Sequence, residues 1–251
     1  MAAAARRCQQ FRRATPRNQE YGAAGRRVRC RARPRLECWA TEHPYRARPG
    51  PVIHALAARL RALPPSCGPV RLIGVDGHAG SGKSTFAGRL AAALGGAPVL
   101  HLDDIASHEE LFDWTGRLLA QVIEPFARGE DARYRPYDWR ARRFGPPRPL
   151  PCAPLVLLEG VGAGRRALRP RLAALLWMEM PAGRAWARGR ARDGEEQREF
   201  WDGWTPAERE HFSADPTRPH AHLLVRQRPE GYEVLEGPSG TGRSRGDPHP
   251  E

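Results

Sequence analysis

A glycine-rich segment at residues 77–85 carries the residue types that can bind a phosphate group. It reads Gly-His-Ala-Gly-Ser-Gly-Lys-Ser-Thr and matches the pattern G-x-x-x-x-G-K-[ST], directly after an apolar run. Glycines let the backbone wrap around an anion, toward which successive N–H groups and the start of a helix then point. In this pattern Lys83 contacts the β- and γ-phosphates of a nucleotide, and Ser84 binds Mg²⁺. We therefore expect nucleotide contacts from Gly77, His78, Ala79, Gly80, Ser81, Gly82, Lys83, Ser84 and Thr85.

The position of Lys83 supports this interpretation. Of the 41 basic residues in the chain, Lys83 is the one lysine and the remaining 40 are arginines. A compact ammonium suits a phosphate loop, and the broad fork of arginine is a poor replacement for it. The alternative is a glycine-rich turn without a ligand, which gives no reason for the lysine to stand at this position.

Acidic residues follow two of the expected strands. Asp103 and Asp104 come after the apolar run 98–102, and Glu159 comes after the run 155–158. In an open parallel sheet the carboxyl ends of the strands line the ligand crevice. Phosphoryl transfer needs a base for the attacking hydroxyl and acids that hold Mg²⁺. We assign the first role to Asp103 and the second to Glu159, and we expect Asp104 to be a helix N-cap.

Three arginines at four-residue intervals, Arg184, Arg188 and Arg192, would lie along one face of a helix. A row of like charges is unfavourable unless an anion or an acid lies opposite it. We expect Arg188 and Arg192 to close over the phosphates as a lid and to stabilise the transferred charge. The alternative is a solvated face paired with the acids at positions 193, 195 and 196.

The elements that would position these side chains alternate between strand and helix. Apolar runs predict strands at 70–75, 98–102, 155–158, 175–180 and 222–226. Helical spacing predicts helices at 52–63, 84–94, 109–128, 182–193 and 206–212. This alternation predicts an α/β fold of the three-layer P-loop NTPase type, with a mainly parallel sheet covered on both faces. Residues 131–154, rich in arginine, aromatic residues and proline, are expected to form a projecting loop or hairpin.

The two ends of the chain differ in composition from this middle part. Residues 1–50 hold 13 arginines and only three acids, so they carry +10 of the net charge of +13. We expect residues 1–51 to be a basic, disordered tail, 52–235 the folded domain and 236–251 a flexible tail. Two interpretations of residues 1–51 remain open: they are a genuine basic tail, or translation of the natural protein starts near Val52.

The composition also bounds the location and the partners. No run of eighteen apolar residues occurs, so we expect no membrane-spanning helix. The five cysteines lack the spacing of a metal site or a disulfide framework, so we expect free thiols in a reducing cytoplasm. The folded part is close to neutral, and we expect nucleic acid to bind only non-specifically, through the basic tail.

Phosphate binding alone leaves several classes of protein open. Switch GTPases read guanine with an Asn-Lys-x-Asp motif, which is excluded because the chain has no second lysine. The Leu-Ser-Gly-Gly-Gln signature of transporter ATPases is also absent from the sequence. Small-molecule kinases remain, together with motor and repair ATPases, which are usually longer.

The order of the motifs resembles the uridine kinase-like branch of the P-loop kinases. The segments GHAGSGKST, LDD, RYRPYDW, LLEGVG and ARGRARDG follow one another across residues 68–226. The resemblance implies a kinase that uses ATP and Mg²⁺, in which Asp103 accepts the proton of a nucleoside 5′-hydroxyl. It also implies that Glu159-Gly160 matches the Glu-Gly of the family and that Arg192-Asp193 ends its lid. The family's acceptor-binding hairpin falls at Tyr134, Arg135 and Tyr137.

One departure bears on the acceptor. Uridine kinases follow the catalytic Asp with an aromatic pair, whereas Ile105-Ala106 stands here. The leading hypothesis is a kinase for a small hydroxyl acceptor such as uridine or cytidine. A nucleoside monophosphate or other metabolite kinase is the alternative, because arginines of the hairpin would suit an anionic acceptor: Arg133, Arg135, Arg140, Arg142 and Arg143. A nucleotide-gated, non-catalytic nucleic-acid-binding protein is a third reading.

Overall fold

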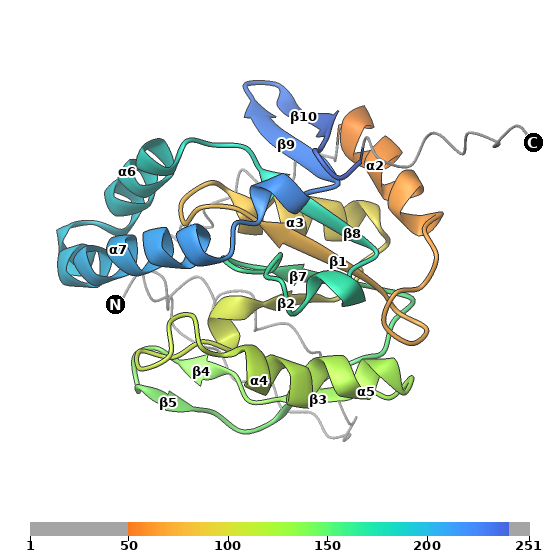
Figure 1. Cartoon of the computed structure of the whole chain (residues 1–251), viewed down its shortest axis with the longest axis horizontal. Helices are drawn as coiled ribbons and strands as arrows, with labels where there is room; N and C mark the ends of the chain where they lie inside the picture. The colour runs from red at the N-terminus through yellow and green to blue at the C-terminus, as the bar shows by residue number, and fades with distance from the viewer. Residues whose placement is uncertain (1–49, 241–251) are drawn as a thin grey trace, which may run out of the picture.

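The computed structural model describes residues 50–240, so the expectations for residues 1–49 and for those from 241 onward lie outside its range. Strands and helices alternate along the described chain around a central six-stranded sheet (Figure 1). The predicted α/β fold with a mainly parallel sheet is confirmed. Among residues 50–240, no helix is both long enough and apolar enough to cross a bilayer.

The central sheet places β1 between two other parallel strands. Its members are β1 (Arg71–Asp76), β2 (Val99–His101), β7 (Leu155–Glu159), β8 (Ala174–Met178), β9 (Leu223–Arg228) and β10 (Gly231–Glu236). They lie in the order β10-β9-β8-β1-β7-β2, and β10 alone among them pairs in the antiparallel sense. Glu159 is in register with Val75 on one side and with His101 on the other. The carboxyl ends of β1, β7 and β2 therefore meet at one edge.

Helices of different lengths connect these strands. The α-helices are α2 (Pro51–Arg61), α3 (Lys83–Ala93), α4 (Thr115–Leu118), α5 (Glu124–Ala127), α6 (Ala182–Asp193) and α7 (Arg198–Ala214). A π-helical segment, η2 (Leu119–Ile123), joins α4 to α5 in one continuous run. Short 3₁₀ helices are η1 (Leu102–Asp104), η3 (Arg169–Arg171), η4 (Glu195–Gln197) and η5 (Arg218–His220).

Two apolar cores cover the two faces of the sheet. Successive side chains of a strand point to opposite faces, so Leu72 and Ile73 of β1 belong to different cores. On one face α2 and α3 bury Leu56 and Phe86 against the sheet. On the other face the α4–α5 run buries residues such as Phe126. This three-layer arrangement is the one that the apolar runs predict.

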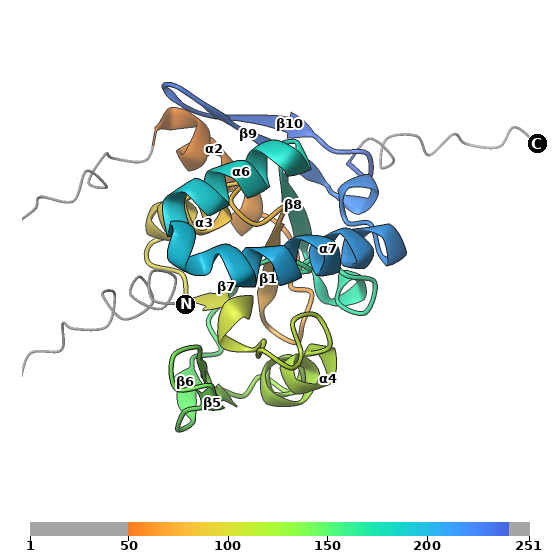
Figure 2. The same ribbon diagram turned by 90° about the vertical axis from the view of Figure 1, so that its left-hand side faces the viewer.

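Helices α6 and α7 form a separate layer over the carboxyl ends of the strands. They lie side by side at the left of Figure 1 and face the viewer in Figure 2. Their indoles form a third apolar cluster, in which Trp201 and Trp204 pack with Val161. The segment that follows β7 thereby packs against α7, which contacts the helix that carries the three arginines.

The projecting segment 131–154 folds as two small antiparallel sheets. Strand β3 (Ala132–Tyr134) pairs with β6 (Arg148–Leu150), and β4 (Tyr137–Asp138) pairs with β5 (Arg143–Phe144). The expectation of a hairpin is thus correct.

Three elements differ from the sequence-based predictions. The helix expected at 109–128 starts only at Thr115, because residues 107–110 form a turn in which Ser107 Oγ accepts the Glu110 N–H at 3.1 Å. Helix α7 begins eight residues before the predicted start, with Pro206 inside it, because Trp201 and Trp204 bury one side of its first turns. Strand β10 was not predicted, since it is an edge strand in which Tyr232 alone is buried.

Candidate active site

A cleft of about 310 Å³ opens at the carboxyl ends of β1, β2 and β7. The predicted residues Lys83, Ser84, Asp103 and Glu159 all line it, although they come from segments far apart in the sequence. Arg192 lines it from α6. The volume is at the small end of the range for ligand sites, so a small molecule fits it better than a polymer does.

The glycine-rich loop connects β1 to α3 and is in tight contact with α6. Gly80 has a φ of +85°, and a Cβ built there would lie 2.0 Å from the carbonyl oxygen of Ala185 in α6. Only glycine therefore lets α6 approach the loop backbone this closely. Gly82 also has a positive φ, and a Cβ built there would lie 3.6 Å from the two terminal nitrogens of Arg188. The loop and the arginine helix thus form one surface.

Lys83 lies at the start of α3 with only 7% of its surface exposed. Its ammonium donates a hydrogen bond of 3.0 Å to the backbone oxygen of His78. The charge is therefore held over the loop, where the pattern places the phosphates of a nucleotide.

The two predicted metal ligands lie next to each other. Ser84 Oγ donates a hydrogen bond of 3.2 Å to Glu159 Oε1, and His101 Nδ1 lies 2.5 Å from Glu159 Oε2. Burial opposes the charge of Glu159, but the hydrogen bond and positive charge of His101 hold its pKa below the ordinary value. Burial also acts against a charged His101, yet Glu159 raises the pKa of that imidazole to about 9.

These residues suit a magnesium ion that is shared with phosphates. Within residues 50–240 no group of three or more His, Cys, Asp or Glu side chains could hold a metal ion. Mg²⁺ commonly takes one or two protein oxygens and completes its shell with water and phosphate oxygens. The Ser84 hydroxyl and the Glu159 carboxylate supply that number.

Asp103 and its neighbour Asp104 have different surroundings. Asp103 faces the cleft and is exposed to water there, whereas Asp104 is buried and accepts a hydrogen bond of 3.1 Å from Tyr134 Oη. Crowding by protein atoms and the charge of Glu159 raise the pKa of Asp103. Lys83 opposes that shift only in part. The expected N-cap role of Asp104 is wrong, because it lies inside η1 and the N-cap of the following helix, α4, is Trp114.

The three arginines of α6 have different positions. Arg192 lines the cleft and is paired with Asp193, with Nε–Oδ1 and Nη2–Oδ2 distances of 2.6 and 2.8 Å. The hydrogen bonds to Asp193 and the field of Asp103 raise the pKa of Arg192. Arg188 donates to Gln227 Oε1 at 2.9 Å, and its guanidinium borders the glycine-rich loop. Arg184 is exposed and lies outside the cleft lining. The ion pair between Arg192 and Asp193 also agrees with the alternative that the arginines of this helix pair with neighbouring acids.

Of the three hairpin residues predicted to contact the acceptor, Tyr137 alone lines the cleft, which Asp103 also lines. Its ring packs edge-on against Trp139 at a centroid distance of 5.2 Å. The Tyr134 ring belongs to the apolar core beneath. Arg135 is exposed and donates to the backbone oxygen of Gly145 at 3.0 Å. The cleft wall at this end is mainly aromatic, with contributions from Phe200, Trp201 and Trp204.

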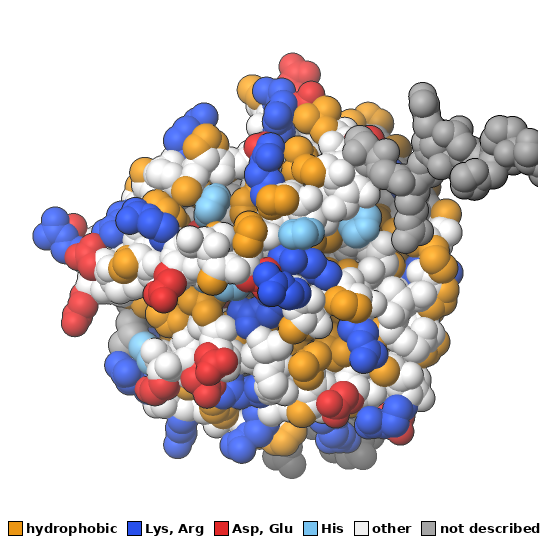
Figure 3. Space-filling model, in the orientation of Figure 1, with side chains coloured by type: hydrophobic (Ala, Val, Ile, Leu, Met, Phe, Trp, Pro, Cys, Tyr) orange, Lys and Arg blue, Asp and Glu red, His pale blue; other side chains and the backbone are white. Residues whose placement is uncertain are grey.

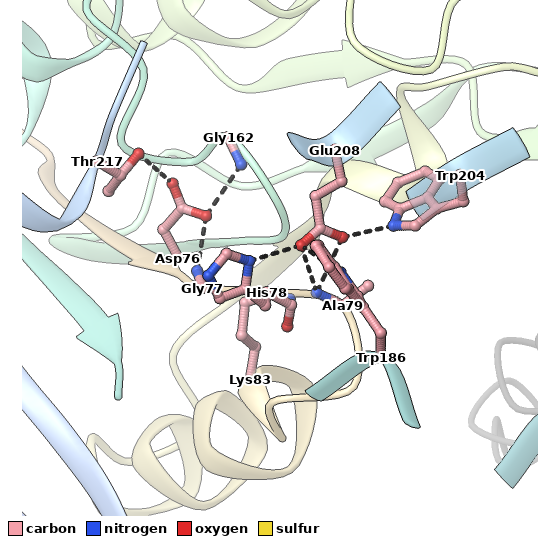
Figure 4. A network of polar contacts seen from close by, with 10 residues as sticks. All are labelled: Asp76, Gly77, His78, Ala79, Lys83, Gly162, Trp186, Trp204, Glu208 and Thr217. Atoms are coloured by element: carbon pink, nitrogen blue, oxygen red, sulfur yellow. Dashed lines mark hydrogen bonds and ion pairs between the residues drawn. The ribbon is translucent and has the colours of Figure 1, made fainter. Parts of the chain in front are cut away.

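A carboxylate that sequence reasoning missed, Glu208 of α7, anchors the glycine-rich loop. Glu208 is fully buried and lies 2.8 Å from His78 Nδ1, and its two oxygens are 3.3 and 3.2 Å from the backbone N of Ala79 (Figure 4). It also accepts the indole N–H groups of Trp186 and Trp204 at 3.0 and 2.6 Å. Burial opposes its charge, but these donors and Lys83 hold the pKa of Glu208 below its ordinary value.

A second buried carboxylate, Asp76, holds the other end of the loop. It accepts hydrogen bonds from the backbone N–H groups of Gly77, Gly162 and Gly164 at 2.7, 2.9 and 2.9 Å. The Thr217 hydroxyl donates to it at 2.8 Å (Figure 4). Asp76 thereby ties the loop to the segment after β7 and to the segment after α7.

Comparisons with known proteins agree with this fold. No model of a known protein family matches the chain, and neither does any curated protein. The structure of a possible uridine kinase from Bacillus stearothermophilus superposes with a TM-score of 0.51 at 20% identity, covering 68% of this chain and 96% of that one. A candidate fructose transport system kinase from Silicibacter sp. TM1040 has 25% identity and a TM-score of 0.42, covering 55% and 80%. The first similarity shows that the chain shares the fold of that Bacillus protein, and the second is too weak to support an argument.

Proposed function

We propose that the protein is a phosphotransferase that moves the γ-phosphate of ATP to a hydroxyl group of a small acceptor. The observation that carries the proposal is the convergence of Lys83, Ser84, Asp103 and Glu159 on one cleft. Phosphoryl transfer depends mainly on positioning and on electrostatic stabilisation, and these residue types supply both.

Asp103 would act as the base. In the proposed reaction the hydroxyl oxygen of the acceptor forms a bond to the γ-phosphorus as the bond to the ADP oxygen breaks. The hydroxyl proton passes to the carboxylate of Asp103. The raised pKa of Asp103 supports this role, because a stronger base accepts a proton more readily near neutral pH.

Cations around the glycine-rich loop would hold the phosphates. Ser84 and Glu159 would bind Mg²⁺, which neutralises charge on the β- and γ-phosphates when it is present. Lys83 would exchange its bond to His78 for phosphate oxygens. Arg188, beside Gly82, and Arg192, in the cleft, would stabilise the charge in transfer from the side of α6.

The acceptor class suggested by the fold is a nucleoside such as uridine or cytidine. The name of the Bacillus protein points in this direction, and the aromatic wall at Tyr137 and Trp139 suits a flat ring. We also place the enzyme in the cytoplasm, because Cys67 and Cys152 are free thiols.

A nucleic-acid-binding function has weaker support. Residues 51–251 carry only +3 of the net charge, and basic and acidic side chains are interspersed over the face seen in Figure 3. Contact with nucleic acid would therefore be non-specific and would come from residues 1–50.

The proposal is tested by measuring ADP release from the whole chain with ATP and Mg²⁺ over nucleosides, nucleotides and sugars. We expect ATP consumption that depends on one class of acceptor and stops when Mg²⁺ is chelated. A chain that binds no ATP, or whose ATP consumption is indifferent to every acceptor, would contradict the proposal.

A further inference from the structure

Arg148 on β6 is a charged residue of the cleft that the proposed reaction does not use. It lines the cleft, as do Pro146, Tyr137 and Trp139 from the same projecting segment. Its Nη1 atom is buried and has no hydrogen-bond partner. Burying a guanidinium nitrogen without a partner is costly, because the nitrogen loses its water and gains nothing in return.

The other charged residues of the cleft show how unusual this is. Within the described part of the chain, each of the following has a polar partner: Lys83, Asp104, Asp138, Glu159, Arg192 and Asp193. Across residues 50–240 no hydrogen bond or ion pair engages the carboxylate of Asp103 or the guanidinium of Arg148. These two side chains are therefore the charged groups of the cleft that are left for a ligand.

We propose that Arg148 binds an anionic group, a carboxylate or a phosphate, on the acceptor. The proposal rests on the proposed transfer of phosphate to a hydroxyl, and it replaces the neutral nucleoside by an acceptor that carries both a hydroxyl and an anion. The hydroxyl meets Asp103, and the anion meets the guanidinium, whose planar fork matches two anionic oxygens. A neutral carbonyl would leave the charge of Arg148 uncompensated in its partly buried position.

The arginines singled out in the sequence do not serve this purpose. Arg133, Arg135, Arg140, Arg142 and Arg143 are all exposed, and the cleft lining includes none of them. Arg148 differs because it stands opposite Tyr134 in the β3–β6 pair and shares the inward face with it. Arg133 is opposite Pro149 and so points to the other face of the same small sheet.

The first test measures binding without turnover. The whole chain is titrated by calorimetry with benzoate, phenyl phosphate and the neutral benzyl alcohol. We expect one of the two anions to bind the parent about 10- to 100-fold more tightly than it binds Arg148→Met, the range for a charge-assisted contact. Arg148→Lys should recover part of the loss, and Arg133→Met should bind like the parent. Equal binding by parent and Arg148→Met, or no binding of either anion, would overturn the inference.

The second test compares acceptors that differ by the anion alone. ADP release is measured with uridine, orotidine and uridine 3′-monophosphate, and with ribose and ribose 5-phosphate. We expect the anionic members to be phosphorylated and their KM to rise about 10- to 100-fold in Arg148→Met, with a smaller change in kcat. Preference for the carboxylate or for the phosphate identifies the group.

The outcomes separate the two proposals. Phosphorylation of a neutral member at the same rate by the parent and by Arg148→Met would overturn the role of Arg148 and leave the kinase intact. Failure to bind or consume ATP would overturn the proposed function, and the calorimetric comparison would still decide whether Arg148 holds an anion. Thermal unfolding of each variant checks that the fold is retained.

Discussion

The two ends of the cleft differ in how their charged groups are satisfied. At the end formed by the glycine-rich loop, Lys83, Glu159 and Glu208 each have partners within the chain. At the acceptor end, Asp103 and Arg148 have no partner within residues 50–240. The phosphate-binding end is therefore built before a ligand arrives, and the acceptor end requires one to complete it. Substitutions at either end should lower turnover, but their effects on the stability of the folded chain should be opposite.

The largest expected effect is at the phosphate-binding end. Lys83→Ala should lower ATP turnover by at least about a thousandfold and weaken ATP binding, because the charge held over the loop is lost. Steady-state ADP release and calorimetric ATP titration measure the two losses. Lys83→Arg should be almost as impaired, since the fork does not fit where the ammonium sits. Turnover at the parent rate in Lys83→Ala would contradict the assignment of the loop.

At the acceptor end, Asp103→Asn should lower kcat by roughly two to four powers of ten with little change in ATP affinity. The amide keeps the size of the carboxylate but cannot accept the proton of the hydroxyl. Asp104→Asn is the matched control, and it should affect stability more than kcat because Asp104 bonds Tyr134 in the core. A larger loss of kcat in Asp104→Asn would show that the base is the other carboxylate.

Removing the loop anchor should cost stability. Glu208→Ala leaves the His78 ring, the Ala79 amide and two indole N–H groups without an acceptor. We expect a loss of about 3 kcal/mol in the free energy of unfolding, measured by denaturant titration. Glu199→Ala, an exposed position on the same helix, should change stability by less than about 0.5 kcal/mol. Equal stabilities of the two variants would mean that the loop does not need its anchor.

The pH dependence of stability should have opposite signs at the two ends. The pKa of Glu208 is lower in the folded state than in the unfolded chain. The charged carboxylate therefore stabilises the fold at neutral pH, and this stabilisation is lost as the pH falls through the folded-state pKa. The pKa of Asp103 is raised in the folded state. Its protonated form therefore stabilises the fold at low pH, and this stabilisation is lost as the pH rises through the folded-state pKa. At pH 7, Asp103→Asn should therefore be more stable than the parent and Glu208→Gln less stable. Both differences should shrink toward pH 4, and denaturant titrations at the two pH values measure them.

The smallest effect is expected from removing residues 1–50. Deleting them should leave ADP release and the thermal midpoint unchanged, because the segment has no apolar periodicity with which to join a core. Retention on heparin should fall with the deletion, since the segment carries +10 of the charge. Loss of turnover in the truncated chain would show that these residues take part in the cleft.

Local patterns predicted the phosphate-binding end better than the acceptor end. The loop, with Lys83 and Ser84, is contiguous in sequence, so its geometry follows from a short motif at a strand–helix junction. Glu208 lies 130 residues from His78, and nothing in the sequence around it signals that a loop amide will be its partner. Sequence reasoning did not single out Arg148, because the segment 131–154 holds many arginines and only the strand register decides which of them faces the cleft.

Asp76 and Glu208 also set the order in which the nucleotide site can be completed as the chain is made. Thr217, which bonds Asp76, lies 141 residues further along the chain, and Glu208 is almost as distant from the loop. A nascent chain that has emerged only as far as residue 200 contains the whole glycine-rich motif but neither of these partners. Contacts of such long sequence separation form late, since the intervening chain must be present and folded first. We expect ribosome-bound fragments to acquire affinity for ATP only after residue 217 has left the exit tunnel.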